Sequence, residues 1–194
     1  MINRENWKAV KKYLRYRSEV DQVSDDTVQL EEGWLKHLLV WSKEEPFFKA
    51  SRIRPTYPEY VVSLRKGNDN KQLSKSYINK CISSARRFLK WLTVHQIGYS
   101  KLTAAYLDTL KAPRITEPPK KREYVSLDEI QAIAHAPTSV MWEKRIRAAA
   151  VFLYLSGMRV TAFATLPLTA VNLEKNLILE YPSLGVQTKN RKYA

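Results

Sequence analysis

The stretch AAAVFLYLSGMR, residues 148–159, decides how the C-terminal part of the chain is built. Its apolar run predicts a helix. Gly157 predicts a tight backbone turn at the end of that helix, because glycine accepts conformations that other residues avoid. Arg159 lies two residues after Gly157, inside a second helix that is predicted over 157–166. Pro167 ends this helix. After residue 170 the apolar period changes from helical to extended, so helices followed by short strands are expected here.

Three short strands are predicted in that extended region. Residues 171–173 and 177–179 form two of them, and 174–176 supply the turn between them. A third strand is expected to begin at 186–189, with 190–192 as the tip of a hairpin. The expected fold class is therefore mainly α with a small antiparallel β-sheet.

The N-terminal part of the chain reads as a bundle of helices. The clearest helix spans 73–95, where Leu73-Ser74 offers a cap and apolar residues return with the helical period. The basic amphipathic helix over 3–17 could lie on a membrane surface, but its tyrosines favour packing within a bundle. The remaining helices of this part are predicted at 27–44, 59–66 and 103–110.

Positive charge is the unusual feature of the composition. The 194 residues include 33 basic and 19 acidic side chains, which give a net charge of +14. Residues 1–113 alone contain 21 basic and 12 acidic side chains, which give a net charge of +9. Such a field attracts polyanions, so double-stranded DNA is the expected partner. The alternative is a helical protein-interaction domain whose charge is incidental. The candidate DNA-binding residues of the 73–95 helix are Lys75, Lys80, Arg86, Arg87 and Lys90.

Residues 113–123, PRITEPPKKRE, are predicted to link two domains, 1–112 and 124–194. Three prolines and the lack of apolar periodicity exclude a helix in this segment. Its basic run is either a solvated connector or a strap along the phosphate backbone of DNA. On the second interpretation Lys120, Lys121 and Arg122 are DNA-binding residues.

The second domain is predicted to begin with two helices. Ser126 and Glu129 have the spacing of a capping box, and Pro137 ends the helix that they open. The next helix is expected over 141–155, which leads into the stretch quoted first.

Two parts of the chain resemble the tyrosine recombinases, the phage-integrase family of DNA breaking and rejoining enzymes. The first part is the helix that contains QLSKSYINK, residues 72–80, and SARRFLKWL, residues 84–92. The second part is the Gly157-Met158-Arg159 turn with the short strands that follow it. Over residues 24–194 the resemblance implies a SAM-like helical core-binding domain and the first half of an α+β catalytic domain. Such enzymes work as tetramers on DNA, form a 3′-phosphotyrosyl intermediate, and need neither metal nor ATP.

The resemblance also implies roles for individual residues. Arg159 matches the first catalytic arginine, which contacts the scissile phosphate; without the resemblance it would simply be a surface arginine. Lys189 matches the hairpin lysine that protonates the leaving 5′ oxygen, with Arg191 or Lys192 as alternatives for that role. Arg191 is also a DNA-binding candidate. Ala162 departs from the family pattern, which has an acidic residue three positions after the arginine.

The motifs that complete the family's active site are absent from residues 1–194. No histidine is followed by an arginine three residues later, and no tyrosine follows such a motif. We therefore expect this polypeptide to bind DNA without cleaving it, as a truncated recombinase that is mainly monomeric off DNA. The alternative is a non-catalytic DNA-binding regulator or a degenerate recombinase.

Other classes of protein are disfavoured by what the sequence lacks. A single cysteine, Cys81, permits no internal disulfide, fits a cytoplasmic protein, and is expected to be a core residue. No secretory leader or bilayer-spanning run is recognised. No metal-ligand spacing or nucleotide-binding glycine loop occurs, so no cofactor is expected.

Overall fold

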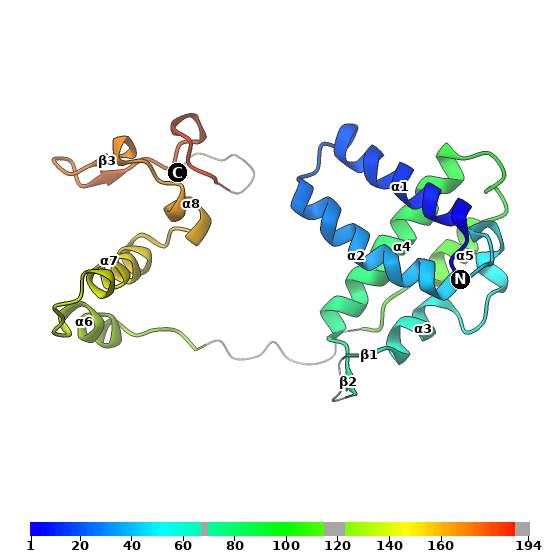
Figure 1. Cartoon of the computed structure of the whole chain (residues 1–194), viewed down its shortest axis with the longest axis horizontal. Coiled ribbons are helices and arrows are strands. Elements are labelled where there is room, and N and C mark those ends of the chain that lie inside the picture. Colours follow the sequence, from blue (N-terminus) through cyan, green and yellow to red (C-terminus); the bar gives the residue numbers. More distant parts are fainter. Residues whose placement is uncertain (67–69, 115–122, 189–194) are drawn as a thin grey trace. The chain divides into compact units, whose positions relative to one another are not determined.

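The structure, a computed structural model, describes residues 1–66, 70–114 and 123–188. The described chain is mainly helical with two small antiparallel sheets (Figure 1). This confirms the predicted fold class. The chain divides into two compact units, Met1–Pro118 and Pro119–Ala194, and the boundary lies in the segment that the sequence suggests as a linker.

Unit 1 consists of packed helices and one short two-stranded hairpin. Its elements are α1 (Arg4–Glu19), α2 (Asp25–Ser42), the 3-10 helix η1 (Phe47–Arg52), α3 (Tyr57–Ser63), β1 (Arg65–Lys66), β2 (Lys71–Gln72), α4 (Lys75–His95) and α5 (Ala104–Thr109). The start of α4 is as predicted, because the Ser74 hydroxyl accepts a hydrogen bond from the Tyr77 amide at 3.2 Å.

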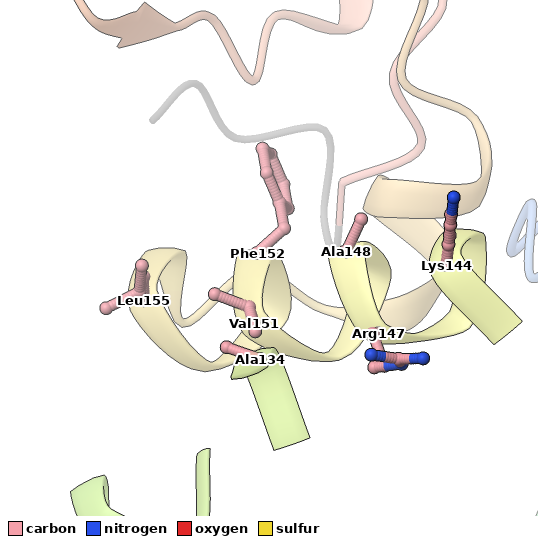
Figure 2. A pocket seen from close by; sticks show the side chains of 7 residues that line it. All are labelled: Ala134, Lys144, Arg147, Ala148, Val151, Phe152 and Leu155. Carbon is pink, nitrogen blue, oxygen red and sulfur yellow. The ribbon is translucent and has the colours of Figure 1, made fainter. Parts of the chain in front are cut away.

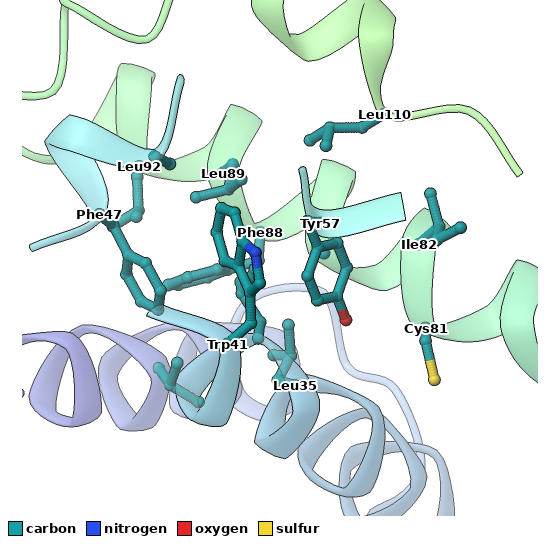
Figure 3. Packing of buried hydrophobic residues seen from close by; sticks show 14 of the residues in the cluster. Leu35, Trp41, Phe47, Tyr57, Cys81, Ile82, Phe88, Leu89, Leu92 and Leu110 are labelled. Carbon is teal, nitrogen blue, oxygen red and sulfur yellow. The ribbon is translucent and has the colours of Figure 1, made fainter. Parts of the chain in front are cut away.

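The core of unit 1 combines aliphatic and aromatic side chains and is centred on α4 (Figure 3). Phe88 of α4 lies 5.3 Å from Tyr13 of α1 and 5.4 Å from Phe47 of η1, measured between ring centroids. Cys81 is fully buried in the same core, as the sequence predicts. Burial of this apolar surface stabilises unit 1.

A short hairpin that the sequence did not predict lies between α3 and α4. Residues 59–66 were expected to be one helix, but α3 ends at Ser63 and β1 begins two residues later. In β1 and β2, Arg65 is opposite Gln72 and Lys66 is opposite Lys71. Arg65 helps to end the helix, since its Nη1 donates to the Val62 and Leu64 carbonyls at 3.0 Å each.

Unit 2 has fewer buried residues. Its elements are α6 (Leu127–His135), α7 (Met141–Ser156), α8 (Val160–Ala164), η2 (Leu168–Ala170), β3 (Val171–Asn172), β4 (Leu177–Ile178) and η3 (Pro182–Leu184). The predicted capping box opens α6: the Ser126 amide donates to Glu129 Oε2 at 2.7 Å, and the Glu129 amide donates to Ser126 Oγ at 3.2 Å. A small cluster formed by Met158, Ala162, Ala170 and Val186 is buried, whereas α7 contains no fully buried residue.

The prediction of a third strand is wrong for the residues described. Residues 171–172 and 177–178 pair as expected, but 186–188 are not a strand. The Gln187 amide instead donates to the Thr165 hydroxyl at 2.9 Å, and Val186 is buried in the small cluster. Residues 186–188 are therefore held by this hydrogen bond and by the burial of Val186, and not by pairing with a strand.

None of the helices in the described ranges is both long and apolar enough to cross a bilayer.

Candidate nucleic-acid interface

Helix α4 has one buried side and one cationic side. At about 100° per residue, its buried residues occupy one continuous arc. All five of its lysines and arginines fall within about 140° of the remaining arc. Four of these five are exposed and Lys75 is half-buried. The helix contains no aspartate or glutamate. The charged side chains that α4 itself contributes are therefore all positive, from Lys75 to Lys90, over about 22 Å of helix.

The two arginines of this surface make ion pairs within the protein. Arg86 Nη2 donates to Asp108 Oδ1 at 2.5 Å, and both side chains are exposed to solvent. Arg87 Nη1 donates to Glu31, whose side chain is only 1% exposed. Half of the Arg87 side chain remains exposed. Arg87 can thus support the bundle and present positive charge on the same surface.

The lysines are held more loosely. Lys80 Nζ lies 5.7 Å from the centre of the Trp34 ring on α2, a cation–π contact. Lys90 is exposed at the middle of the arc, and among the described residues its ammonium has no ion-pair partner. A lysine of this kind can contact a phosphate without first giving up another partner.

Two uncharged polar residues between the cations were missed by the sequence analysis. Asn79 and Ser83 are exposed near the centre of the arc, and the Ser83 hydroxyl donates to Asn79 Oδ1 at 3.0 Å. Asparagine and serine are residue types that hydrogen-bond to base edges in the major groove. Their four-residue spacing within a basic helix is the signal that could have identified them.

Arg159 is placed by the turn that ends α7. Gly157 adopts the left-handed conformation, with φ at +63°, and its amide donates to the Leu153 carbonyl at 3.0 Å. Arg159 then takes the N-cap position of α8 with its side chain exposed, so the predicted helix over 157–166 is shorter than expected. Met158 is buried beside it and anchors the turn. The guanidinium is therefore presented to solvent from a fixed backbone.

Ala162, where the family has an acidic residue, lies in the buried cluster and is 1% exposed. A carboxylate at this position would be buried among apolar side chains, which is costly without a partner. Within the ranges that the structure describes, Arg159 also has no ion-pair or hydrogen-bond partner for its side chain. The geometry thus shows an arginine without an orienting carboxylate.

Several candidate residues lie outside the described residues, so their predicted roles in DNA binding and catalysis stay predictions. They are Lys120, Lys121, Arg122, Lys189 and Arg191, together with the alternative Lys192.

A cavity of about 500 Å³ lies between α6 and α7 (Figure 2). Its lining is apolar, from Ala134, Val151 and Leu155 among others, with Lys144 and Arg147 at one end. The Arg147 guanidinium is already bonded to the Ala136 carbonyl. Among the residues that the structure describes, the lining contains no pair of acid and base and no predicted site residue.

No group of three histidine, cysteine, aspartate or glutamate side chains in the described part of the chain could hold a metal ion. Comparisons of the chain with known protein families, curated proteins and solved structures found no match.

Proposed function

We propose that residues 1–194 are the DNA-binding, N-terminal part of a tyrosine recombinase. The observation that carries this proposal is the outer side of α4, whose own side chains supply five cations and no carboxylate opposite a packed side. Two of these cations, Arg86 and Arg87, pair with carboxylates from other helices. A helix of this kind fits the major groove of B-DNA, which is wide enough to admit it. In the proposal unit 1 is the SAM-like core-binding domain and unit 2 is the first half of the catalytic domain.

Arg159 would bind the phosphate at which strands are exchanged. A guanidinium suits this task because it donates two parallel hydrogen bonds to phosphate oxygens and stays charged. In the complete reaction a tyrosine oxygen bonds to phosphorus, and the 5′ oxygen departs with a proton from Lys189, which leaves a 3′-phosphotyrosyl ester. We expect residues 1–194 alone to trap no such adduct on nicked DNA, and an adduct would contradict this part of the proposal.

The test of DNA binding is a titration of duplex DNA at several salt concentrations. The double variant Arg86→Gln/Lys90→Gln removes two cations from the α4 surface, and Lys49→Gln/Lys101→Gln removes two exposed cations elsewhere in unit 1. The α4 variant should reduce the magnitude of the salt slope by about 1.8, or about 0.9 for each lost phosphate contact. Equal affinities for the two variants would argue against α4 as the interface, and a wild type that binds no duplex DNA at low salt would overturn the proposal.

A second candidate function is a DNA-binding regulator without recombinase activity. The burial of Ala162 favours it, because nothing in the described chain orients Arg159 as the family's carboxylate would. The variants Arg159→Ala and Arg145→Ala separate the two, since both residues are exposed arginines of unit 2. In a recombinase fragment, Arg159→Ala should reduce the affinity for DNA more than Arg145→Ala does. In a regulator that does not use Arg159, the two variants should reduce the affinity for DNA equally.

A further inference from the structure

The N-terminal half of α4, residues 75–83, has uncharged polar side chains at the middle of its outer side. At about 100° per residue, Ser76, Asn79 and Ser83 lie within about 30° of the line opposite the centre of the buried arc. All three are exposed. Lys75 and Lys80 lie about 70° to either side of the same line. In this half of the helix the cations therefore flank a neutral, hydrogen-bonding strip.

The C-terminal half of α4, residues 84–95, has its cations nearer the middle. Lys90 lies about 10° from the line opposite the buried arc, and Arg86 and Arg87 lie about 50° to either side of it. The two halves thus offer different chemistry to a partner. The C-terminal half offers mainly charge, whereas the N-terminal half offers neutral donors and acceptors between two lysines.

The Asn79 amide is held by a neighbour one turn further along α4. Ser83 Oγ donates to Asn79 Oδ1 at 3.0 Å, and Asn79 Nδ2 takes no part in this bond. A carbonyl oxygen can accept two hydrogen bonds, so Oδ1 keeps one acceptor position, and the NH₂ group has two donors. The amide therefore presents an acceptor and a donor side by side, in an orientation that the serine fixes.

This acceptor and donor match the edge of adenine in the major groove. Adenine presents its N6 amino group as a donor and N7 as an acceptor there, and asparagine can bond to both at once. Guanine presents two acceptors, cytosine a donor, and thymine an acceptor beside a methyl group, so none of them offers the same pair. The amide of Asn79 is thus complementary to one base of the four.

The position of Asn79 on α4 is also the one that a base contact requires. When a helix lies in the major groove, the middle of its outer side is nearest to the base edges, and phosphates lie towards its flanks. Asn79 and Ser83 occupy the middle, and Lys80 occupies a flank. Phosphate contacts by the lysine would place the helix in the groove, and the amide would then meet a base.

We propose that Asn79 recognises an adenine in the major groove of the duplex bound by α4, and that Ser83 positions the Asn79 amide. This inference rests on the proposed DNA binding and deepens it, because the partner becomes duplex DNA with an A·T pair opposite Asn79. The cations supply affinity for any duplex, since phosphate contacts carry no sequence information. The amide supplies selectivity.

Selection from a pool of short DNA duplexes of random sequence tests the proposal. The wild type should select an adenine at one position and bind that duplex about fivefold to a hundredfold more tightly than a duplex with guanine there. Asn79→Ala should lose this preference and keep the wild-type salt slope, because the variant removes no charge. Lys80→Gln should keep the preference, weaken binding to every duplex, and reduce the magnitude of the salt slope by about 0.9.

Two further variants separate the role of this amide from a general effect. Ser83→Ala should reduce the preference for adenine by about twofold to tenfold, because the hydrogen bond that positions the amide is lost. Gln29→Ala removes an exposed amide from α2, about 160° around that helix from Glu31, which pairs with α4. This control should keep the wild-type preference. Asn79→Ala should also keep the wild-type fold and Tm or raise the Tm slightly, because alanine favours an exposed helical position.

The outcomes distinguish this inference from the proposed function. If the wild type binds duplex DNA but selects no adenine, or if Asn79→Ala selects the same adenine as the wild type, the inference is overturned and the proposed function stands. An unchanged preference in Ser83→Ala would overturn the positioning role of Ser83. A wild type that binds no duplex DNA at low salt would overturn both the inference and the proposed function.

Discussion

Arg17 Nε donates to Glu31 Oε2 at 3.0 Å, and the Glu31 side chain is 1% exposed. Arg87 bonds to the other oxygen of the same carboxylate, so Glu31 joins α1, α2 and α4. We expect Glu31→Ala to lower the free energy of unfolding of unit 1 by about 2–4 kcal/mol, because two arginines lose a buried partner. Urea unfolding measures this loss.

The neighbouring Glu32 provides the control. It pairs with Lys11 at 3.0 Å near the surface. Glu32→Ala should cost less than about 1 kcal/mol, as for other exposed ion pairs. Similar losses for the two variants would contradict a special role for the buried carboxylate.

A second prediction concerns alkaline pH. Burial, and then the negative charge of Glu31, raises the pKa of Tyr13 to about 12, above the ordinary value of 10.0. Between these values the folded state keeps a proton that the unfolded state has lost. The free energy of unfolding should therefore be unaffected by Tyr13 below pH 10 and fall as the pH rises from 10 to about 12, by at most about 1.4 kcal/mol per pH unit.

Unfolding measured in urea across this pH range tests the Tyr13 prediction. Tyr13→Phe should make the decline shallower by the contribution of one proton. Tyr124→Phe alters a tyrosine that is 83% exposed and should leave the decline unchanged. An identical decline in wild type and Tyr13→Phe would show that this phenol does not cause it.

The thiol of Cys81 should be inert in the folded protein. The residue is fully buried, and burial raises the pKa of its thiol to about 11, so almost no thiolate forms at about pH 8. Ellman's reagent should modify it at least about a hundredfold more slowly in native protein than in denaturant. Rapid modification of native protein would mean that α4 opens readily from the core.

Two glycines should respond to alanine with opposite signs. Gly157 has φ at +63°, so Gly157→Ala should lower the stability of unit 2 by about 1 kcal/mol. Gly33 lies inside α2, and an added Cβ would meet no atom within 4 Å. Gly33→Ala should raise the stability of unit 1 by about 0.5–1 kcal/mol. Thermal unfolding of both variants measures the signs, and destabilisation by Gly33→Ala would contradict the open space around that position.

Amide hydrogen exchange should differ between the two long helices α4 and α7. Helix α4 buries nine residues, whereas α7 buries none completely. Because exchange in a helix requires local or global opening, central amides of α7 should exchange at least about tenfold faster than those of α4. Equal protection would indicate that α7 is covered in solution.

The sequence by itself determined most of the helices, although α3 and α8 are shorter than predicted. Caps and apolar periodicity act over a few residues, so Ser74 as the start of α4, the Ser126–Glu129 capping box and the burial of Cys81 could all be predicted from neighbouring residues. The charge of the α4 surface was equally readable, because a helix of known period fixes which residues share a side.

Tertiary structure alone decided which of these residues have partners. Arg87 and Glu31 are 56 positions apart, so only the packing of α2 against α4 could bring them together. The β1–β2 hairpin likewise depended on packing, because its two-residue strands are too short for a clear period. Packing also buried Ala162 and turned 186–188 away from strand pairing. Contacts between distant segments depend on how all the apolar faces are buried together, and no local pattern records that outcome.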